Sequence, residues 1–484
     1  MKKQALTKLS FIFALLSLAF ILNACSQKKE TTGTSDDRKY IIATDTTFAP
    51  FEFEDTNGEF VGIDMDLLNA IAEDQGFTFE IKPLGFNAAV QALESNQVDG
   101  VIAGMSITDE RKEKFDFSDA YFDSGVVMAV SEKEKNISSY ADLKGKNVAI
   151  KTGTEGATFA NSIKDKYGFT TTTFDDSSNM YEEVKSGNAV ATFEDYPVIA
   201  YGINQGNGLK LATEKEAGGQ YGFAVNQGEN EALIKMFNEG LQHLKDSGQY
   251  QEIVDKYLAT PESKASETGF IGLIKENYKK LLDGLGKTLL ITLVSILLAA
   301  IIGILFGLLS VAPNRGLKVI ATLYVDLMRG LPLIVLAFFI YFGIPSLTGI
   351  RLSATIAGIT TLSLNAGAYI AEIVRGGINA VDNGQLEAAR SLGLPYGKAM
   401  QKVILPQAIR MMIPSFINQF VITLKDTSIL SVIGLVELTQ TGKIIIARNL
   451  QSFDMWLIIG LIYIIVITIL TKISKQLERR IQNG

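Results

Sequence analysis

Charged, hydroxyl-bearing and aromatic residues follow several short apolar stretches in the first half of the chain, where strands of a sheet are expected to end. An arginine binds a carboxylate through two parallel hydrogen bonds, and an aspartate suits an ammonium group. Arg111 and Asp195 could therefore hold the two charged ends of a zwitterion. The other members of the set could contact the rest of such a molecule: Asp45, Phe48, Phe86, Gly104, Ser106, Lys151 and Thr154.

Other site chemistries find little support in the composition. The chain has one cysteine, Cys25, and one histidine, His243, which lies in an amphipathic stretch typical of a helix surface. Zinc sites and Ser–His–Asp triads normally need histidine held by partner residues, so we expect no metal, no cofactor and no catalytic residue. Arg111 has a second interpretation, because the run DERKEK around it is also typical of a solvated helix face.

The elements that must position these residues alternate between strands and helices. KYIIAT and FTFEIKPL are typical strands, while MDLLNAIAEDQG and AAVQALESNQ have helical periodicity. The pattern starts again at KNVAIKTG and runs to AVATFEDYPVIAYGI. The sequence predicts two α/β lobes with largely parallel sheets and a ligand cleft between them. Crossovers between the lobes are expected near 126–132 and 220–227.

The second half of the chain has a different character. Acidic residues outnumber basic ones in 27–260, whereas 261–484 is apolar with an excess of lysine and arginine. We expect the α/β domain to occupy 38–260, a linker 261–284 and an all-α membrane domain 285–478. Five spans are predicted, near 287–311, 317–344, 353–374, 407–434 and 455–473. Lysine and arginine favour a cytoplasmic C-terminus, with the α/β domain outside a cell membrane.

The N-terminal segment predicts export. Three lysines precede an apolar run in residues 1–25, and Leu22-Asn23-Ala24-Cys25 resembles the lipobox of bacterial lipoproteins. Acylation of Cys25 is the implied modification; an uncleaved signal anchor is the alternative. Residues 26–37 are polar and suit a tether.

Four stretches resemble the polar amino-acid receptors of ABC importers: TDTTFAPFEF, GIDMDLLNAIA, AGMSITDERKEKFDFSDAYFDSG and KTGTEG. The resemblance implies a type II periplasmic-binding-protein fold that closes on an amino acid. It also implies that Arg111 and Ser106 hold the α-carboxylate and that Asp195 holds the α-ammonium. Phe48 and Phe86 would sandwich the side chain, with Thr154 nearby, and Gly104 would offer its carbonyl.

Within that family the pattern is most similar to the glutamine receptor, in which an aspartate and a lysine meet the two ends of a side-chain amide. Asp45 and Lys151 stand at these positions. An amide offers a donor and an acceptor together, so glutamine is the favoured ligand. Glu155 and Glu194 depart from the glutamine pattern and leave a basic or acidic amino acid as the alternative.

The predicted cytoplasmic loop 376–406 contains Glu387-Ala388-Ala389, Gly393 and the segment VILP, and it resembles the signature of ABC permease subunits. The resemblance implies a coupling helix that docks on a separate cytoplasmic ATPase, and permeases that pair as a homodimer through the membrane domain. GLGKT at 284–288 lacks the first glycine of a phosphate loop, so ATP hydrolysis by this chain is not expected.

Two less favoured functions remain at this point. A ligand-gated channel would interrupt the receptor sequence with its pore, and an enzyme such as a cyclohexadienyl dehydratase can share the receptor fold. No nucleic-acid partner is expected. Lys425 and Asp426 either pair with each other or line the pathway through the membrane domain.

Overall fold

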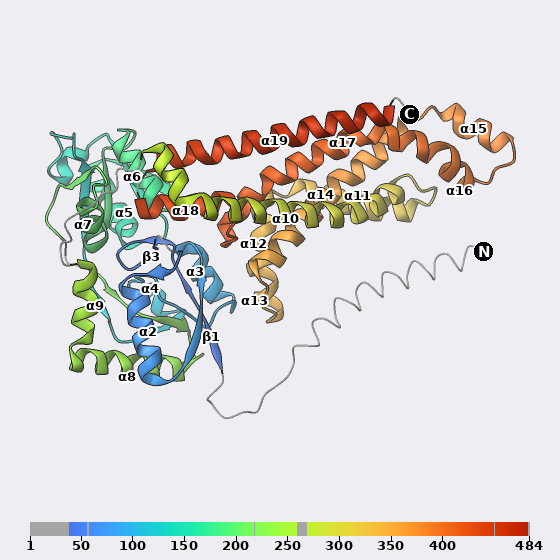
Figure 1. Ribbon diagram of the computed structural model, residues 1–484. Coiled ribbons are helices and arrows are strands. Elements are labelled where there is room, and N and C mark those ends of the chain that lie inside the picture. Colours follow the sequence, from blue (N-terminus) through green and yellow to red (C-terminus); the bar gives the residue numbers. More distant parts are fainter. Residues whose placement is uncertain (1–37, 56–57, 217, 259–268, 450, 483–484) are drawn as a thin grey trace.

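A computed structural model describes residues 38–55, 58–216, 218–258, 269–449 and 451–482 (Figure 1). An α/β part ends at residue 258 and a helical part begins at residue 269. The expected signal peptide, Cys25 and the tether 26–37 lie outside the described residues.

The first lobe is built on a five-stranded sheet in the order β5-β1-β6-β15-β7. Its strands are β1 (Lys39–Thr44), β5 (Thr78–Pro83), β6 (Gly100–Val101), β7 (Phe115–Phe117) and β15 (Ala224–Asn226). β1 pairs in parallel with β5 and β6, and β15 runs antiparallel to β6 and β7. The helices of this lobe are α2 (Ile63–Gln75), α3 (Phe86–Glu94), α4 (Asp109–Lys112), α8 (Glu231–Ser247) and α9 (Gln249–Leu258).

A small antiparallel sheet caps this lobe beside the start of α2. It consists of β2 (Thr47–Phe48), β3 (Glu52–Glu54) and β4 (Phe60–Val61). Helix α2 is capped by Gly76, whose φ of 71° is the left-handed conformation that glycine adopts without strain.

The second lobe repeats the plan with the strand order β11-β10-β12-β9-β13. The strands are β9 (Val126–Ser131), β10 (Asn147–Lys151), β11 (Thr170–Phe174), β12 (Ala191–Asp195) and β13 (Leu209–Leu211). Its helices are α5 (Glu155–Tyr167), α6 (Ser177–Lys185) and α7 (Tyr196–Asn204). Lys151 and Asp195 are thus the last residues of parallel neighbouring strands, so both lie at the same edge of the sheet.

Two short antiparallel strands join the lobes. β8 (Phe122–Asp123) leads into β9 of the second lobe, and β14 (Gln220–Tyr221) leads back into β15 of the first. The first crossing therefore comes a few residues before the expected 126–132, because those residues already belong to the second sheet. A Cβ on Gly218 would lie 2.2 Å from the Cα of Gly125, so the two crossing segments need glycine to pass this closely.

The helical part contains four long apolar helical segments among its described residues: Phe270–Ser310, Ala354–Asn379, Tyr396–Ile433 and Ser452–Ile473. They comprise α10 (Phe270–Ser310), α14 (Ala354–Asn379), α16 (Tyr396–Ala399) continuing into α17 (Leu405–Asp426), and α19 (Ser452–Gln482). The shorter helices are α11 (Arg315–Gly330), α12 (Leu333–Phe338), α13 (Ile344–Thr348), α15 (Asn383–Ser391) and α18 (Leu438–Asn449).

The second expected span, 317–344, is not one straight helix. Arg315–Gly330 and Leu333–Thr348 meet at an angle of 103°, and together they make the fifth apolar element. Leu331 has extended backbone angles (φ −90°, ψ 133°) and precedes Pro332. Proline disfavours the helical conformation of the residue before it and has no N–H to donate, so the bend lies at this pair.

The expected linker 261–284 is also partly helical. Residues 270–284 form the first turns of α10, which continues unbroken to Ser310. Leu273 and Leu281 are buried on one face of this extension, in an apolar cluster with Leu438 and Ile445 of α18. This tertiary packing explains why the segment is helical before the membrane span begins.

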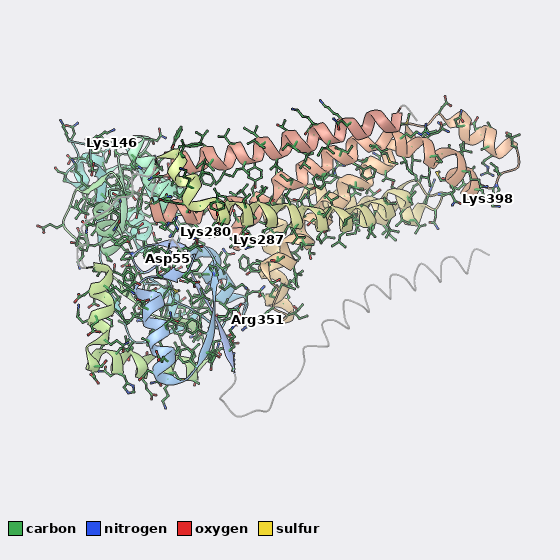
Figure 2. All side chains as sticks on the ribbon, in the orientation of Figure 1. Asp55, Lys146, Lys280, Lys287, Arg351 and Lys398 are labelled. Atoms are coloured by element: carbon green, nitrogen blue, oxygen red, sulfur yellow. The ribbon has the colours of Figure 1, made fainter. Side chains whose placement is uncertain are left out.

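The α/β part lies at one end of the helical bundle, and α15 and α16 lie at the other (Figure 1). Figure 2 shows the same arrangement by residue, with Asp55, Lys280 and Arg351 at the junction and Lys398 at the far end. The predicted coupling loop and the predicted receptor are therefore on opposite sides of the helical bundle.

The first lobe makes most of the polar contacts at this junction. Arg351 donates to the carboxylate of Asp99 at 2.9 and 3.2 Å and to the Asn96 carbonyl at 2.7 Å. Gln97 donates to the Tyr341 carbonyl at 2.5 Å, and its side-chain oxygen accepts the Leu352 N–H at 3.0 Å.

Two further cations hold the same lobe from other helices. Lys280 of α10 pairs with Glu54, and Arg448 of α18 donates to the Asp55 carbonyl at 2.8 Å. The second lobe contributes one ion pair, between Asp176 and Lys443, whose atoms are 4.0 Å apart. Helix α6 of the second lobe also packs against α18 and α19. Among the described residues, the helical part therefore makes more polar contacts with the first lobe than with the second.

We expect Arg351→Glu to loosen the first lobe. Two charge-assisted hydrogen bonds would be replaced by repulsion from Asp99. Because Arg351 is partly exposed, we expect the free energy of local opening at the junction to fall by only about 1.4 kcal/mol, which corresponds to about tenfold more frequent opening. Hydrogen exchange of peptides covering 339–352 would measure it. Lys443→Glu is the matched control at the second lobe. Equal exchange in the unaltered chain and the Arg351→Glu variant would contradict the asymmetry.

Candidate ligand-binding site

A narrow pocket lies between the two lobes. The residues expected from the sequence line it, with the exception of Asp45, and Ala103 and Glu155 join them. The full lining is Phe48, Phe86, Ala103, Gly104, Ser106, Arg111, Lys151, Thr154, Glu155 and Asp195. Side chains far apart in the sequence meet here because the carboxyl ends of the parallel strands in each lobe face the crossing segments.

Arg111 is held by both lobes. It sits on the short helix α4, which Thr108 caps by accepting the Arg111 N–H. Its guanidinium donates to the Ser106 carbonyl in the first lobe and to the Gly153 carbonyl in the second, each at 2.7 Å. It also lies 5.3 Å from the ring centre of Phe86. These contacts fix the plane of a group that suits a carboxylate.

Two aromatic rings form apolar walls of the pocket. Phe86 is the first residue of α3, and Phe48 lies in β2 against Phe51 and Tyr221. Gly104 allows the chain to pass beneath Phe48: its φ is 51°, and a Cβ there would lie 2.4 Å from the Phe48 ring. Any side chain at this position would displace the ring and narrow the pocket.

The second lobe contributes the amino end of a helix. Thr154 caps α5, accepting the Ala157 N–H at 3.3 Å and donating to the Lys151 carbonyl at 2.8 Å. Glu155 follows in the first turn, and its Oε2 is buried without a hydrogen-bond partner among the described residues. The sequence marked Glu155 only as a departure from the glutamine pattern, and the structure places it at the pocket.

Asp45 and Lys151 form a buried ion pair across the lobes. Lys151 Nζ lies 2.6 Å from Asp45 Oδ2, and the side chains are 1% and 2% exposed. The Thr46 and Thr47 N–H groups donate to the other oxygen of Asp45. Burial alone would lower the pKa of Lys151, but the Asp45 and Glu194 carboxylates outweigh it and the pKa is raised.

This pairing changes the expectation for Asp45. Its carboxylate oxygens are occupied by Lys151 and by backbone N–H groups, and it does not line the pocket. The structure therefore places Asp45 behind Lys151 rather than on the wall of the pocket. Asp45 instead reaches the pocket through Lys151, because opposite charges this close in a dry interior pair before either turns to another group.

Asp195 keeps one acceptor free of protein partners. Tyr221 donates its hydroxyl hydrogen to Oδ2, while Oδ1 is buried with no partner among the described residues. Burial raises the pKa of Asp195, and the neighbouring Glu194 raises it further, to about 8. Sequence reasoning missed Tyr221, which shows only as an aromatic residue in a crossover segment.

The predicted coupling residues lie at the far end of the helical bundle. Glu387, Ala388 and Ala389 are on α15, and Gly393 follows that helix with a φ of 85°, in a turn closed by hydrogen bonds to the Arg390 and Ala389 carbonyls. Leu392 in this turn is 85% exposed. Lys425 and Asp426 end α17, and the described residues contain no ion pair between them.

Comparison with known proteins assigns both parts. Residues 40–260 match the bacterial extracellular solute-binding proteins, family 3, and residues 299–483 match the inner membrane component of binding-protein-dependent transport systems. The arginine transport system permease ArtQ of Bacillus subtilis is 38% identical over 204 residues, which cover 42% of this chain and 93% of that protein. The chain belongs to the amino-acid ABC importers.

Two other similar proteins are both named GlnP. The glutamine transport system permease GlnP of Escherichia coli is 36% identical over 203 residues, covering 42% of this chain and 93% of that protein. A crystal structure of the second substrate-binding domain of Lactococcus lactis GlnP, in an open conformation, is 44% identical and covers 47% of this chain and 98% of its own, with a TM-score of 0.38. Both matched families are transport families rather than enzymes, so this importer is neither the dehydratase nor the channel considered above.

The high pKa of Asp195 predicts that ligand binding releases a proton. With a pKa of about 8, Asp195 is mostly protonated at pH 7, whereas an ammonium group needs the ionised form. Affinity should therefore rise as the pH increases from 6 to 8, and calorimetry in buffers of different ionisation enthalpy would measure the proton released.

Two variants separate the contributions to this effect. We expect Asp195→Asn to abolish the proton release and to weaken binding by about 10- to 100-fold, the range for a lost hydrogen bond to a charged group. Glu194→Gln removes the second cause of the raised pKa and should reduce the release. A binding heat that does not depend on the buffer would contradict this role of Asp195.

Proposed function

We propose that this chain captures glutamine outside the cytoplasm and imports it with the help of a separate ATPase. The observation that carries the choice of ligand is the buried Lys151, which lines the pocket while paired with Asp45. Its ammonium repels a cationic side chain, and its charge is already balanced by Asp45, which disfavours a second carboxylate.

The constant part of an amino acid suits the other charged groups of the pocket. Arg111 supports binding of the α-carboxylate, with the Ser106 segment beside it. The unpartnered oxygen of Asp195 supports binding of the α-ammonium. Phe48, Phe86 and Gly104 would enclose the side chain, and Thr154 would mark its far end.

A neutral amide suits the remaining polar groups better than a charged side chain does. Lys151 can donate a hydrogen to the amide oxygen, and Glu155, with its unpartnered oxygen, can accept from the amide nitrogen. Asp45 would act by holding Lys151 in place.

Arginine is a second candidate, because Glu155 and Glu194 add negative charge on the second-lobe side of the pocket. The similarity to the ArtQ permease, whose name specifies arginine transport, favours it as well. Lys151 is the residue that decides between the two ligands.

The membrane half supports transport driven from the cytoplasmic side. The predicted coupling residues lie opposite the solute-binding domain, as they must if a cytoplasmic ATPase docks on α15 while the receptor stands outside (Figure 1). We propose a multi-pass protein of the cell membrane with a cytoplasmic C-terminus and a lipidated Cys25.

We further propose that two copies pair through their membrane domains. A stripe of exposed apolar side chains on α10, spaced three or four residues apart, provides a surface for lipid and for the second copy: Leu290, Leu293, Leu297, Ile301 and Ile304.

Calorimetry of the purified full chain against the polar amino acids tests the ligand. We expect glutamine to bind at least about 100-fold more tightly than arginine or glutamate, which corresponds to about 2.8 kcal/mol. Lys151→Met should remove glutamine binding, and Glu155→Gln should weaken it less.

The double variant Asp45→Asn/Lys151→Met is the folding control, since it leaves no unpaired charge in the interior. It should fold and still fail to bind glutamine. Tight arginine binding with no heat from glutamine would replace the first candidate with the second, and full glutamine affinity in Lys151→Met would refute the proposed contact.

The exposed Leu392 provides a test of the ATPase contact. Leu392→Asp should lower ATPase binding and uptake by about tenfold or more, because an apolar side chain of this size contributes about 1.5–3 kcal/mol when an interface buries it. Leu347→Asp is the matched control, since Leu347 is 81% exposed but lies on α13, away from α15. Co-purification of the ATPase with each variant would measure the effect, and equal losses in both would contradict the proposal.

A further inference from the structure

Two carboxyl groups are buried in the first lobe directly behind the ligand pocket. Glu52 in β3 and Asp64 in the first turn of α2 are both 0% exposed. Neither oxygen of Glu52 accepts a hydrogen from any donor among the described residues, and Oδ1 of Asp64 does not either. The Asp64 N–H donates at 3.0 Å to the carbonyl of Phe51, the residue before Glu52, and the two carboxyl groups are close enough for the charge of Asp64 to act on Glu52.

We propose that Glu52 and Asp64 share one proton and act with Tyr121 as positioning residues for the pocket. Two carboxylates in contact in a dry interior cannot both be ionised, and one proton between them gives each a partner. This proposal rests on the proposed function in one respect: glutamine is the ligand used to test it. Membership of the amino-acid importer family does not depend on which amino acid is bound.

The neighbouring groups indicate which acid holds the proton. Asp64 Oδ2 accepts the Gly104 N–H and the Tyr121 hydroxyl, each at 2.8 Å, and both bonds favour an ionised Asp64. The charged groups that face Glu52 are Asp64, Asp45 and Lys151. Burial first, and then the two aspartates, raises the pKa of Glu52 far above its usual value, whereas burial raises that of Asp64 only to about 6 against its hydrogen bonds. Glu52 is therefore the donor.

The first consequence of this arrangement is that the Gly104 peptide is held in a fixed orientation at the pocket. Gly104 lines the pocket at a φ of 51° and donates its N–H to Asp64. The direction of that N–H fixes the peptide plane beneath Phe48. A shift of Asp64 would therefore move a pocket-lining segment without any change in a residue that touches the ligand.

The same aspartate is tied to the crossing strands. Tyr121 immediately precedes β8, its N–H donates to the Tyr221 carbonyl at 2.9 Å, and its carbonyl accepts the Tyr250 hydroxyl at 2.6 Å. Tyr221 in turn donates to Asp195 on the second-lobe side of the pocket. Through Asp64, the shared proton would therefore position both the Gly104 peptide at the pocket and the crossing segment that contains Tyr121.

Infrared difference spectra of the full chain test the proton directly. The spectrum of the unaltered chain minus that of Glu52→Gln should contain the band of a protonated, buried carboxyl group at neutral pH. Glu54→Gln, on the same strand, is the matched control and should leave that band in place. A difference spectrum for Glu52→Gln without the band would overturn the proposal.

Binding separates positioning from folding. Glu52→Gln keeps a donor for Asp64, so glutamine affinity should stay within about threefold, while Glu52→Ala should lower it by about tenfold, the value of one hydrogen bond to a charged group. Equal losses in the two variants would refute the positioning role. If Glu52→Ala does not fold, the infrared band and the glutamine affinity of Glu52→Gln still test the shared proton and the positioning role. If the unaltered chain does not bind glutamine, the proposed ligand fails, and the same comparison with arginine as the probe tests the pair.

Discussion

The ion pair between Asp45 and Lys151 is the constraint on which the binding domain depends. Asp45 directly follows β1 of the first lobe and Lys151 is the last residue of β10 in the second. Both side chains are almost completely buried, so neither charge is tolerable without the other. The pair brings the two strand ends together and places Lys151 at the pocket. The positive charge of Lys151 also acts on the buried acids around it. The raised pKa values of Glu52 and Glu194 both include a lowering contribution from this lysine. The proposed ligand contacts and the observed contact between the lobes therefore involve the same charges.

The membrane domain contacts the two lobes unequally. Among the described residues, Arg351, Lys280 and Arg448 all contact the first lobe, whereas the second lobe has one long ion pair and the packing of α6 on α18 and α19. The apolar core continues across the same junction, since Leu84 and Phe86 of the first lobe share a cluster with Leu336 and Tyr341 of the helical part. This asymmetry leads us to expect that any separation of the lobes moves the second lobe, while the first stays with the membrane domain.

The sequence predicts the pocket well because strand ends are easy to locate: apolar stretches followed by Arg111, Lys151 or Asp195 place these side chains at one edge of a sheet. It does not predict that Asp45 turns to Lys151, because pairing across two lobes depends on how closely they approach. The bend at Leu331 was signalled by Pro332, yet hydropathy alone gives a continuous span. Tyr221 and the Glu52–Asp64 pair have no sequence signal, since their roles come from hydrogen bonds between residues far apart in the chain.

Helix α10 has a mechanical consequence. It runs without a break for 41 residues, about 60 Å at 1.5 Å per residue, from the neighbourhood of Glu54 to the level of the coupling loop. Lys280, in the N-terminal part of α10, pairs with Glu54 of the first lobe, and just past the C-terminal end of the helix the Val311 carbonyl accepts a hydrogen bond from Tyr396. A rod of this length turns a tilt of about 5° at one end into a displacement of about 5 Å at the other. The same helix thus gives the two faces of the membrane a common lever arm.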